Sequence, residues 1–249
     1  MIRGSLAPYQ SANGSQMPKL IAIVEDEPAI RDNYTDYLTR QGYRVNGYAS
    51  RQAASSAFGR QLPDLVILDI GLQDEPDAGF ELCRELRSRS ANLPIIFLTA
   101  RDDEFDTVSG LRLGADDYLT KSISLPQIAA RIAALFRRLD ALQTQQSSDN
   151  ILTPGSLRLD LDRLTAHWRE QPVELTLTEF WMVHALARHP GHVRSRDQLM
   201  EEANILVDAA SVSTHIKRIR QKFQQLDAGF SAIDAVYGAG YRWLENGQS

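Results

Sequence analysis

The segment Asp64-Leu-Val-Ile-Leu-Asp69 places four consecutive apolar residues directly before an aspartate. A short apolar run bounded by turn-forming residues is typical of a buried strand. Similar runs, some weaker, occur at Leu20–Val24, Arg44–Tyr48, Ile95–Leu98 and Asp117–Lys121. Helical patterns of apolar residues separate them, within 28–42, 80–86, 108–111 and 128–135. Strands that alternate with helices predict an α/β fold with a doubly wound, five-stranded parallel sheet covered on both faces.

The composition predicts a globular chain of about two domains. Of the 249 residues, 43% are hydrophobic and 24% are charged, and no apolar run approaches the roughly 18 residues that a membrane span needs. A single cysteine excludes an internal disulfide framework and fits a reducing cytosol, so we expect a cytoplasmic protein without a membrane partner. The net charge of −5 gives no indication of nucleic-acid binding, so any basic surface must be local.

We expect four segments. Residues 1–16 are polar, rich in Gly and Ser, and indicate a leader or an expression arm, with Met17 as the natural start. Residues 17–139 form the first domain, and the polar residues 140–150 form a linker. Residues 151–246 form the second domain.

Polar side chains end the strands of the first domain. Glu25-Asp26, Asp69, Thr99 and Lys121 each follow an apolar run, and ligands of open α/β sheets bind outside the carboxyl ends of the strands. Each feature alone is more often an ordinary turn or surface residue. Together, several carboxylates favour a divalent cation, and oxygen ligands alone favour Mg2+. The set predicts a phosphoryl-transfer site in which Asp69 is the nucleophile.

Residues 18–139 resemble a bacterial response-regulator receiver domain, with its flavodoxin-like fold, through I-V-E-D-E, V-I-L-D-I, F-L-T-A and D-D-Y-L-T-K. The resemblance implies that Asp69 is the phospho-acceptor. It implies Asp26 as a direct Mg2+ ligand, Glu25 as a ligand through water, and the carbonyl of Gly71 as a third protein oxygen. It also implies roles for Thr99 (hydrogen bond to the phosphoryl group), Lys121 (pairing with its charge) and Tyr118 (an aromatic switch that moves inward with Thr99). An ordinary core tyrosine is the alternative for Tyr118.

Two departures from the receiver pattern stand beside the pocket. The family lysine is usually followed by a cis-proline, whereas this chain has Lys121-Ser122, so we expect a trans bond and a differently shaped loop. The turn Gln73–Gly79 is longer and more acidic than usual, which predicts an altered lifetime of the acyl phosphate. This turn and L-T-K-S-I-S-L-P further resemble the regulators of a proteobacterial dedicated sortase system.

A long helix predicted at Ala209–Leu226 carries the most informative pattern of the second domain. Its apolar stripe is Val212, Ile216, Ile219, Phe223 and Leu226. Its polar face is mostly basic and comprises Thr214, His215, Lys217, Arg218, Arg220 and Lys222. Such a face suits the major groove of DNA, although a solvated face is the usual explanation for a charge run alone.

Residues 151–246 resemble the winged-helix effector domain of the OmpR/PhoB family through E-L-T-L-T-E-F, R-S-R-D-Q-L, V-S-T-H-I-K-R-I-R and Y-G-A-G-Y-R-W. The resemblance implies an α+β winged helix-turn-helix domain that binds double-stranded DNA. Thr214 and Arg218 would reach base edges, His215, Lys217 and Arg220 would hold phosphates, and Thr178 and Arg196 would assist. Tyr237 stands where the wing of the family commonly has an arginine, which predicts weaker reliance on A/T-rich flanks.

The resemblance also implies a homodimer of receivers on activation. The matching apolar patch is Val108, Leu111, Ala129 and Ile132. Ion pairs across the interface would join Asp117 to Arg131, and Asp116 or Asp117 to Arg138. A basic–acidic pair of the relatives is replaced by Thr107 and Gln127, so we expect a weaker dimer.

The sequence therefore predicts a two-component transcriptional regulator that is phosphorylated by a sensor histidine kinase and is not an enzyme apart from autodephosphorylation. RNA polymerase is a further candidate partner. One alternative is a regulator that binds DNA constitutively and has a vestigial pocket. Another is a phosphatase of the haloacid-dehalogenase kind, which would need a second acid where Gly71 stands.

Overall fold

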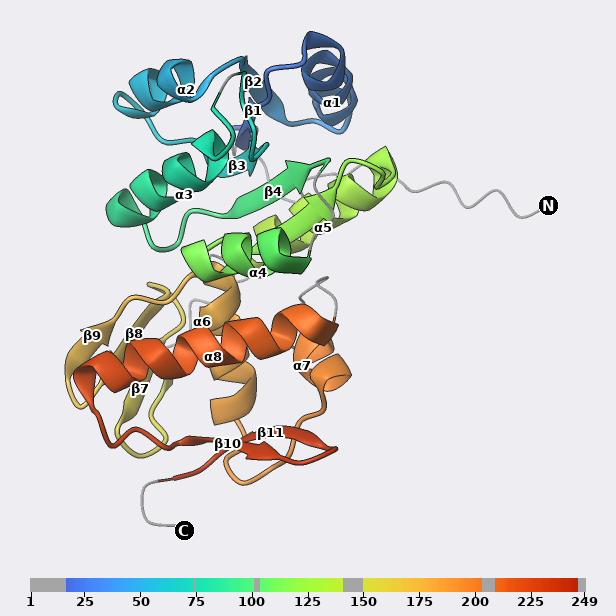
Figure 1. Cartoon of the computed structure of the whole chain (residues 1–249). Coiled ribbons are helices and arrows are strands. Elements are labelled where there is room, and N and C mark those ends of the chain that lie inside the picture. Colours follow the sequence, from blue (N-terminus) through green and yellow to red (C-terminus); the bar gives the residue numbers. More distant parts are fainter. Residues whose placement is uncertain (1–16, 74, 101–103, 141–149, 203–208, 246–249) are drawn as a thin grey trace.

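The computed structural model describes residues 17–73, 75–100, 104–140, 150–202 and 209–245. The N-terminal part alternates strands and helices in the order β1 (Leu20–Val24), α1 (Pro28–Arg40), β2 (Arg44–Tyr48), α2 (Arg51–Phe58), β3 (Leu65–Leu68), α3 (Ala78–Arg89), β4 (Ile95–Thr99), α4 (Glu104–Leu113), β5 (Asp117–Thr120) and α5 (Leu125–Asp140). Its five strands form one parallel sheet in the order β2-β1-β3-β4-β5 (Figure 1). The predicted doubly wound α/β fold is confirmed.

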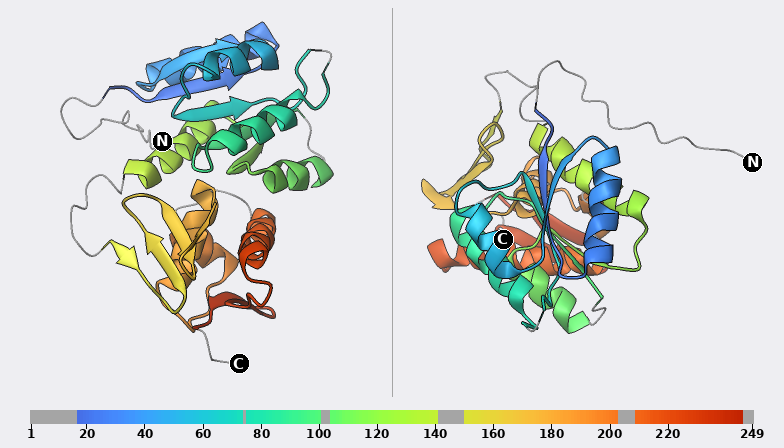
Figure 2. Two further views of the ribbon diagram at one scale, coloured as in Figure 1. Left: turned by 90° about the vertical axis from the view of Figure 1, so that its left-hand side faces the viewer. Right: turned by 90° about the horizontal axis from the view of Figure 1, so that it is seen from above.

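Helices cover both faces of the sheet. Because alternate residues of each strand point to opposite sides, each strand contributes side chains to both layers. Ile21 and Ile23 of β1 pack in the cluster that contains residues of α1 and α5. Ala22 and Val24 pack in the cluster formed with α2 and α3. Figure 2 shows the sheet from above, with helices on both sides. This double covering explains why the central strands β1, β3 and β4 are apolar and buried along nearly their whole length.

Helix α2 was not predicted from the sequence. Only Ala54 and Phe58 of its eight residues are buried, so its apolar face is too short to produce a clear helical period. The sequence signal for this helix was its N-cap residue, Ser50. The Ser50 hydroxyl accepts a hydrogen bond from the Ala53 amide at 3.2 Å.

The C-terminal part begins with an antiparallel sheet and continues with three helices and a hairpin. The order is β6 (Ile151–Leu152), β7 (Leu157–Asp160), β8 (Thr165–Trp168), β9 (Gln171–Val173), α6 (Leu177–Ala187), α7 (Arg196–Glu202), α8 (Ala209–Leu226), β10 (Ile233–Val236) and β11 (Gly240–Trp243). The predicted winged helix-turn-helix architecture is confirmed, with a four-stranded sheet β6-β7-β8-β9 and the β10-β11 hairpin as the wing.

An aromatic cluster forms the core of the C-terminal part. The ring of Trp168 lies 5.7 Å from Phe223, 5.1 Å from Phe230 and 6.2 Å from Trp243. Four of the five predicted stripe residues of α8 are buried in this core, whereas Leu226 at its end is exposed. The stripe therefore attaches α8 to its own domain and leaves its other faces for other contacts.

The two parts meet along helices rather than through the sheets. Helix α4 packs against α8, and the first turn of α6 reaches the same seam (Figure 1). Within the described residues, no helix has both the length and the apolar character needed to cross a bilayer.

Candidate functional sites

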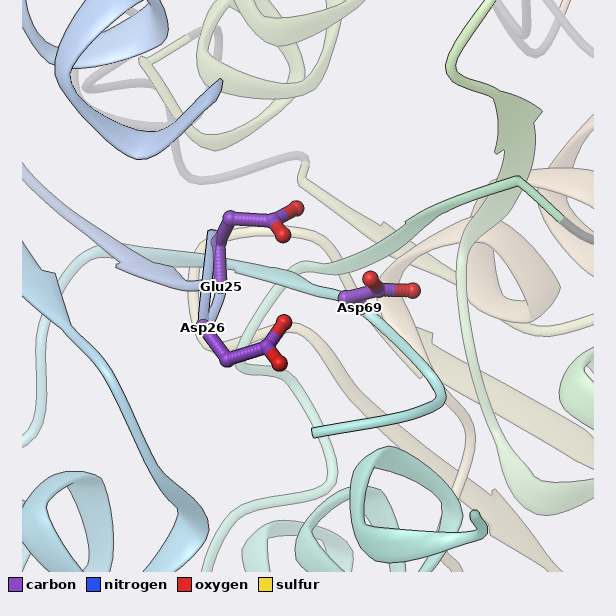
Figure 3. A group of neighbouring side chains, drawn as sticks. All are labelled: Glu25, Asp26 and Asp69. Carbon is purple, nitrogen blue, oxygen red and sulfur yellow. The ribbon is translucent and has the colours of Figure 1, made fainter. Parts of the chain in front are cut away.

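Three carboxylates meet at the carboxyl edge of the parallel sheet. Glu25 and Asp26 follow β1 and Asp69 follows β3, and one ligand oxygen from each lies within 4.8 Å of the others. Figure 3 shows the Glu25 and Asp26 side chains extending from the end of β1 on the side of Asp69. Adjacent parallel strands end at the same edge, which is why residues 44 positions apart in the chain become neighbours.

The ammonium group of Lys121 bridges two of these acids. Its Nζ atom donates to Asp69 Oδ2 at 2.7 Å and to Glu25 Oε1 at 2.9 Å. Burial raises the pKa of Glu25, although the hydrogen bond from Lys121 opposes this effect. Burial also acts to lower the pKa of Lys121, but the hydrogen bonds to Asp69 and Glu25 outweigh it and raise that pKa overall. The lysine therefore stays charged and offsets the repulsion between the acids.

Backbone amides orient the other carboxylate oxygens. The amide of Ile70 donates to Asp69 Oδ1 at 2.7 Å, and the amide of Gln73 donates to Asp26 Oδ2 at 2.9 Å. Gln73 reaches Asp26 with a positive φ of 54°, a conformation that is uncommon outside glycine. The acidic turn predicted from the sequence thus folds back onto the acid cluster.

Gly79 brings the start of α3 against the phospho-acceptor loop. Its amide donates to the Ile70 carbonyl at 2.8 Å. A Cβ atom at this position would lie 2.1 Å from the Asp69 carbonyl oxygen, which no side chain can tolerate. The glycine is therefore required for the close approach that positions Asp69.

The two predicted switch residues lie within the neighbouring strands β4 and β5. Thr99, the last residue of β4, is buried, and its carbonyl accepts a hydrogen bond from the Lys121 amide at 2.8 Å. Tyr118 in β5 is partly buried, and its ring centroid lies 6.2 Å from that of Phe97. The peptide bond between Lys121 and Ser122 is trans, as expected for a non-proline residue.

The donor set fits a hard divalent cation. All three clustered side chains offer oxygen, and no His or Cys joins them among the described residues. Gly71, whose carbonyl was predicted as a further ligand, belongs to the same loop after Asp69. Oxygen-only ligands of this kind suit Mg2+ better than zinc or copper.

The predicted DNA-binding residues do not share one exposed face. Lys217 and Tyr237 are exposed, and Thr214 is partly exposed. Arg220 turns back to its own domain, where Nη2 donates to the Ile233 carbonyl at 2.9 Å and the guanidinium lies over the Tyr241 ring. His215 and Arg218 are buried.

Arg218 and Lys222 converge on Glu179 of α6, a residue that the sequence analysis did not single out. Arg218 Nη2 lies 3.2 Å from Glu179 Oε1, and Lys222 Nζ lies 2.6 Å from Glu179 Oε2. Burial acts to raise the pKa of Glu179, but the charges of Arg218 and Lys222 together lower it. The available signal was the capping box Thr176-x-x-Glu179, which the structure contains.

The predicted dimer residues differ from the expected surface patch. Leu111 and Asp116 are covered, and Ile132 is fully buried in the core with Ile128 and Leu135, because that side of α5 packs on the sheet. Ala129 is partly buried. The side chains of Val108 and Arg138 lie outside the described part of the chain.

The ion pair expected between two copies forms within one chain. Arg131 Nη1 lies 2.7 Å from Asp117 Oδ2, because α5 packs beside β5 in the same domain. Asp116 pairs with Arg87, whose Nη2 lies 2.8 Å from Asp116 Oδ2. In this conformation neither acid depends on a second copy for a basic partner.

Two family models match the chain. Residues 21–133 match the response regulator receiver domain, and residues 170–243 match the C-terminal domain of transcriptional regulatory proteins. The chain is 36% identical over 227 residues to the transcriptional regulatory protein BaeR of Escherichia coli O6:H1, covering 90% of this chain and 92% of BaeR. It is also 36% identical to CreB of Escherichia coli K12, covering 88% of this chain and 95% of CreB.

The similarity extends to a solved structure that matches most of the chain. A mutant of RitR shares a TM-score of 0.72 and 25% sequence identity, covering 91% of this chain and 99% of that chain. A receiver with a strand-edge acid cluster, joined to a winged-helix domain, defines a response regulator. The chain belongs to the OmpR/PhoB family of response regulators.

Proposed function

We propose that the chain is a phosphorylation-activated, DNA-binding regulator of transcription that accepts a phosphoryl group on Asp69 from a sensor histidine kinase. The observation that carries the proposal is the cluster of Glu25, Asp26 and Asp69 with Lys121 between two of its members. The family supports a kinase and DNA as partners.

In the proposed reaction, a carboxylate oxygen of Asp69 attacks the phosphorus atom of a phosphohistidine. The new O–P bond forms as the P–N bond breaks, and the histidine nitrogen leaves with the bonding pair and takes up a proton. Glu25, Asp26, Asp69 and the Gly71 carbonyl would hold Mg2+, which when bound offsets the charge of the phosphoryl oxygens. Lys121 would pair with one of those oxygens and the Thr99 hydroxyl would donate to another. Attack of water on phosphorus would later restore the aspartate, which is the autodephosphorylation expected here.

The DNA-binding step is assigned to α8 and the wing. Thr214 and Arg218 would read base edges, and Lys217 together with other basic residues of the helix would contact phosphates. Receiver dimers would place two winged-helix domains on half-sites about one helical turn apart. RNA polymerase is proposed as a partner of the bound dimer.

The domain limits 17–139 and 151–246 stay predictions. The assignment to the sortase-system subgroup also stays a prediction.

A constitutive regulator with a vestigial pocket is the weaker alternative. A vestigial pocket has no need for the close Gly79 approach, the Lys121 bridge or the oriented Asp26 carboxylate, and all three are present. The phosphatase alternative is not supported either, because both halves of the chain match regulator families.

Acetyl phosphate with Mg2+ tests the proposed chemistry directly. Mass spectrometry of the intact full-length chain should show one added phosphoryl group, and peptide mapping should place it on Asp69. The Asp69→Asn variant should remain unmodified, whereas Asp36→Asn, a change at an exposed carboxylate on α1, should be modified like the wild type. An unmodified wild type, or equal labelling of the Asp69→Asn variant, would contradict the proposal.

A further inference from the structure

Each carboxylate of the acid pocket, which is formed by Glu25, Asp26 and Asp69, has an oxygen that is already engaged by a donor of the chain. Lys121 Nζ lies 2.7 Å from Asp69 Oδ2 and 2.7 Å from Glu25 Oε2, and it donates to Glu25 Oε1 at 2.9 Å. Asp26 is held by a different group, the Gln73 amide, which donates to Oδ2 at 2.9 Å. Oδ1 is the Asp26 oxygen left for a cation.

This arrangement limits how the carboxylates can bind a metal ion. A carboxylate that has given one oxygen to a hydrogen bond binds a cation through the other oxygen alone. Ca2+ takes about six to eight oxygen ligands and often chelates a carboxylate through both oxygens, whereas Mg2+ requires a near-ideal octahedron and keeps several waters. A site that offers single carboxylate oxygens therefore favours Mg2+.

The backbone that carries Asp26 is fixed independently of Gln73. Arg31 Nη1 donates to the Glu25 carbonyl at 2.7 Å and to the Asp26 carbonyl at 3.2 Å. A Cβ atom at Gly47 in β2 would lie 2.9 Å from Arg31 Cδ, so the glycine leaves the room that this side chain occupies. Asp26 therefore stays in place when the turn changes, and Gln73 decides only whether Oδ2 is free.

The turn that carries Gln73 is held by a clamp of three residues, Arg51, Leu72 and Glu75. Leu72 is buried and exchanges backbone hydrogen bonds of 3.1 and 3.0 Å with Glu75. Glu75 Oε2 accepts a hydrogen bond of 3.0 Å from Arg51 Nε at the start of α2. Gln73 has a φ of 54°, which is unfavourable for a residue with a side chain. The clamp offsets this cost and keeps the Gln73 amide directed at Asp26.

We propose that the Gln73 amide, held by the clamp, is a selectivity element of the acid pocket that favours Mg2+ over Ca2+. By occupying Asp26 Oδ2, it denies Ca2+ a chelating carboxylate and keeps the site for the ion that phosphoryl transfer uses. The element lies in the turn Gln73–Gly79, where this chain departs from the receiver pattern. The inference rests on the proposed function, because it takes the acid pocket as the Mg2+ site, but not on DNA binding.

Two substitutions at the exposed Gln73 separate the amide from the side chain. Gln73→Pro removes the amide hydrogen and cannot adopt a positive φ, so Asp26 Oδ2 becomes free. Gln73→Gly keeps the amide and adopts a positive φ without strain, which makes it the matched control. Isothermal titration calorimetry of the full-length chain measures the affinities for Mg2+ and for Ca2+.

We expect Gln73→Pro to bind Ca2+ about tenfold more tightly than the wild type does, because Ca2+ gains a second oxygen of Asp26. The Mg2+ affinity should change less than about threefold, since Mg2+ uses one oxygen of the carboxylate in either case. Gln73→Gly should keep the wild-type ratio of the two affinities. An unchanged ratio in Gln73→Pro, or the same change in both variants, would overturn the proposal.

Two variants of the clamp leave Gln73 itself intact and decide the question if Gln73→Pro fails to fold. Glu75→Gln and Arg51→Gln each break an exposed ion pair, whose contribution is small. We expect a gain in Ca2+ affinity of about two- to threefold and faster hydrogen exchange of the Gln73 amide. Arg40→Gln, at an exposed position of α1, is the control and should alter neither. Faster exchange without a gain in Ca2+ affinity, or no change in either, would contradict the proposal.

The same titrations separate this proposal from the proposed function. If the wild type binds Mg2+ and every variant keeps the wild-type preference, only the selectivity role of Gln73 is overturned. If the wild type binds neither cation, the assignment of a metal site to the acid pocket fails, and the selectivity role fails with it.

Discussion

The acid pocket and the recognition helix differ in what completes them. The pocket is assembled from one domain, because Glu25, Asp69 and Lys121 all follow strands of a single sheet. The recognition helix α8 is built by its own core, yet its availability is set by the other domain, through the bond from Arg218 to Leu111. Chemistry at strand ends is thus determined locally, whereas the exposure of a binding face depends on domain docking.

The largest expected effect concerns the free energy of unfolding. It tests whether the ion pair of Arg218 with Glu179 in its own domain contributes as much as the contact of Arg218 with the receiver. Glu179→Ala leaves Arg218 and Lys222 without their buried acid and removes the capping box of α6. Loss of one partner of a buried ion pair costs about 3–5 kcal/mol. Urea unfolding of the full chain should show this loss, while Glu174→Ala, an exposed neighbour, should change little.

A pH titration sharpens the contrast between the two domains, because all five histidines lie in the C-terminal half. Burial lowers the pKa of His184 to about 4 from 6.5. The unfolded chain therefore takes up the proton first, so stability is fully present above about pH 6.5 and is lost as the pH falls toward 4. The loss should reach up to about 2 kcal/mol between about pH 7.5 and pH 5.

His184→Gln should remove this loss when urea unfolding is repeated at both pH values. His192→Gln, at an exposed position on the same domain, is the control and should behave like the wild type. Equal pH dependence in the wild type and His184→Gln would show that folding does not change the pKa of the partly buried His184 imidazole.

Removal of the bridging lysine would test whether a group of the receiver itself sets the charge of the pocket and therefore its affinity for Mg2+. Lys121→Gln takes a positive charge away from Glu25 and Asp69, so Mg2+ should bind about tenfold more tightly, since a single charge nearby contributes energies of this order. Isothermal titration calorimetry measures the affinity. Lys19→Gln is the control, because Lys19 lies just before β1, at the end opposite the acid pocket, and pairs with Asp140. The Mg2+ affinity of this variant should be unchanged. Weaker Mg2+ binding by Lys121→Gln would contradict this account of the pocket.

The smallest expected effect concerns the wing. Tyr237 is fully exposed at the tip between β10 and β11. Tyr237→Arg should improve binding about threefold on duplexes with A/T-rich flanks, because arginine is attracted to the negative potential of a narrow minor groove. Binding to G/C-rich flanks should stay nearly constant. An unchanged flank preference would show that the wing does not enter the groove in the expected way.

Much of the fold followed from the residues alone. The period of the apolar runs identified the five strands, and the strand-end rule placed Glu25, Asp69, Thr99 and Lys121 at one edge. Helix α2 and Glu179 were missed, because one has too little buried surface for a pattern and the other is polar on an otherwise buried helix. Ile132 and Arg131 were placed in an intermolecular contact, whereas the structure uses both within the receiver.

The sequence by itself determined which groups could carry out the chemistry, because strand ends and helix faces are fixed by short-range periodicity. Only the tertiary structure decided which of those groups are accessible. Arg218 is buried and donates to the carbonyl of Leu111, far away in the chain, and an amide of α6 meets Asp116 of the receiver. No local pattern encodes such a docking, because its free energy comes from surfaces that become neighbours only after both domains have folded.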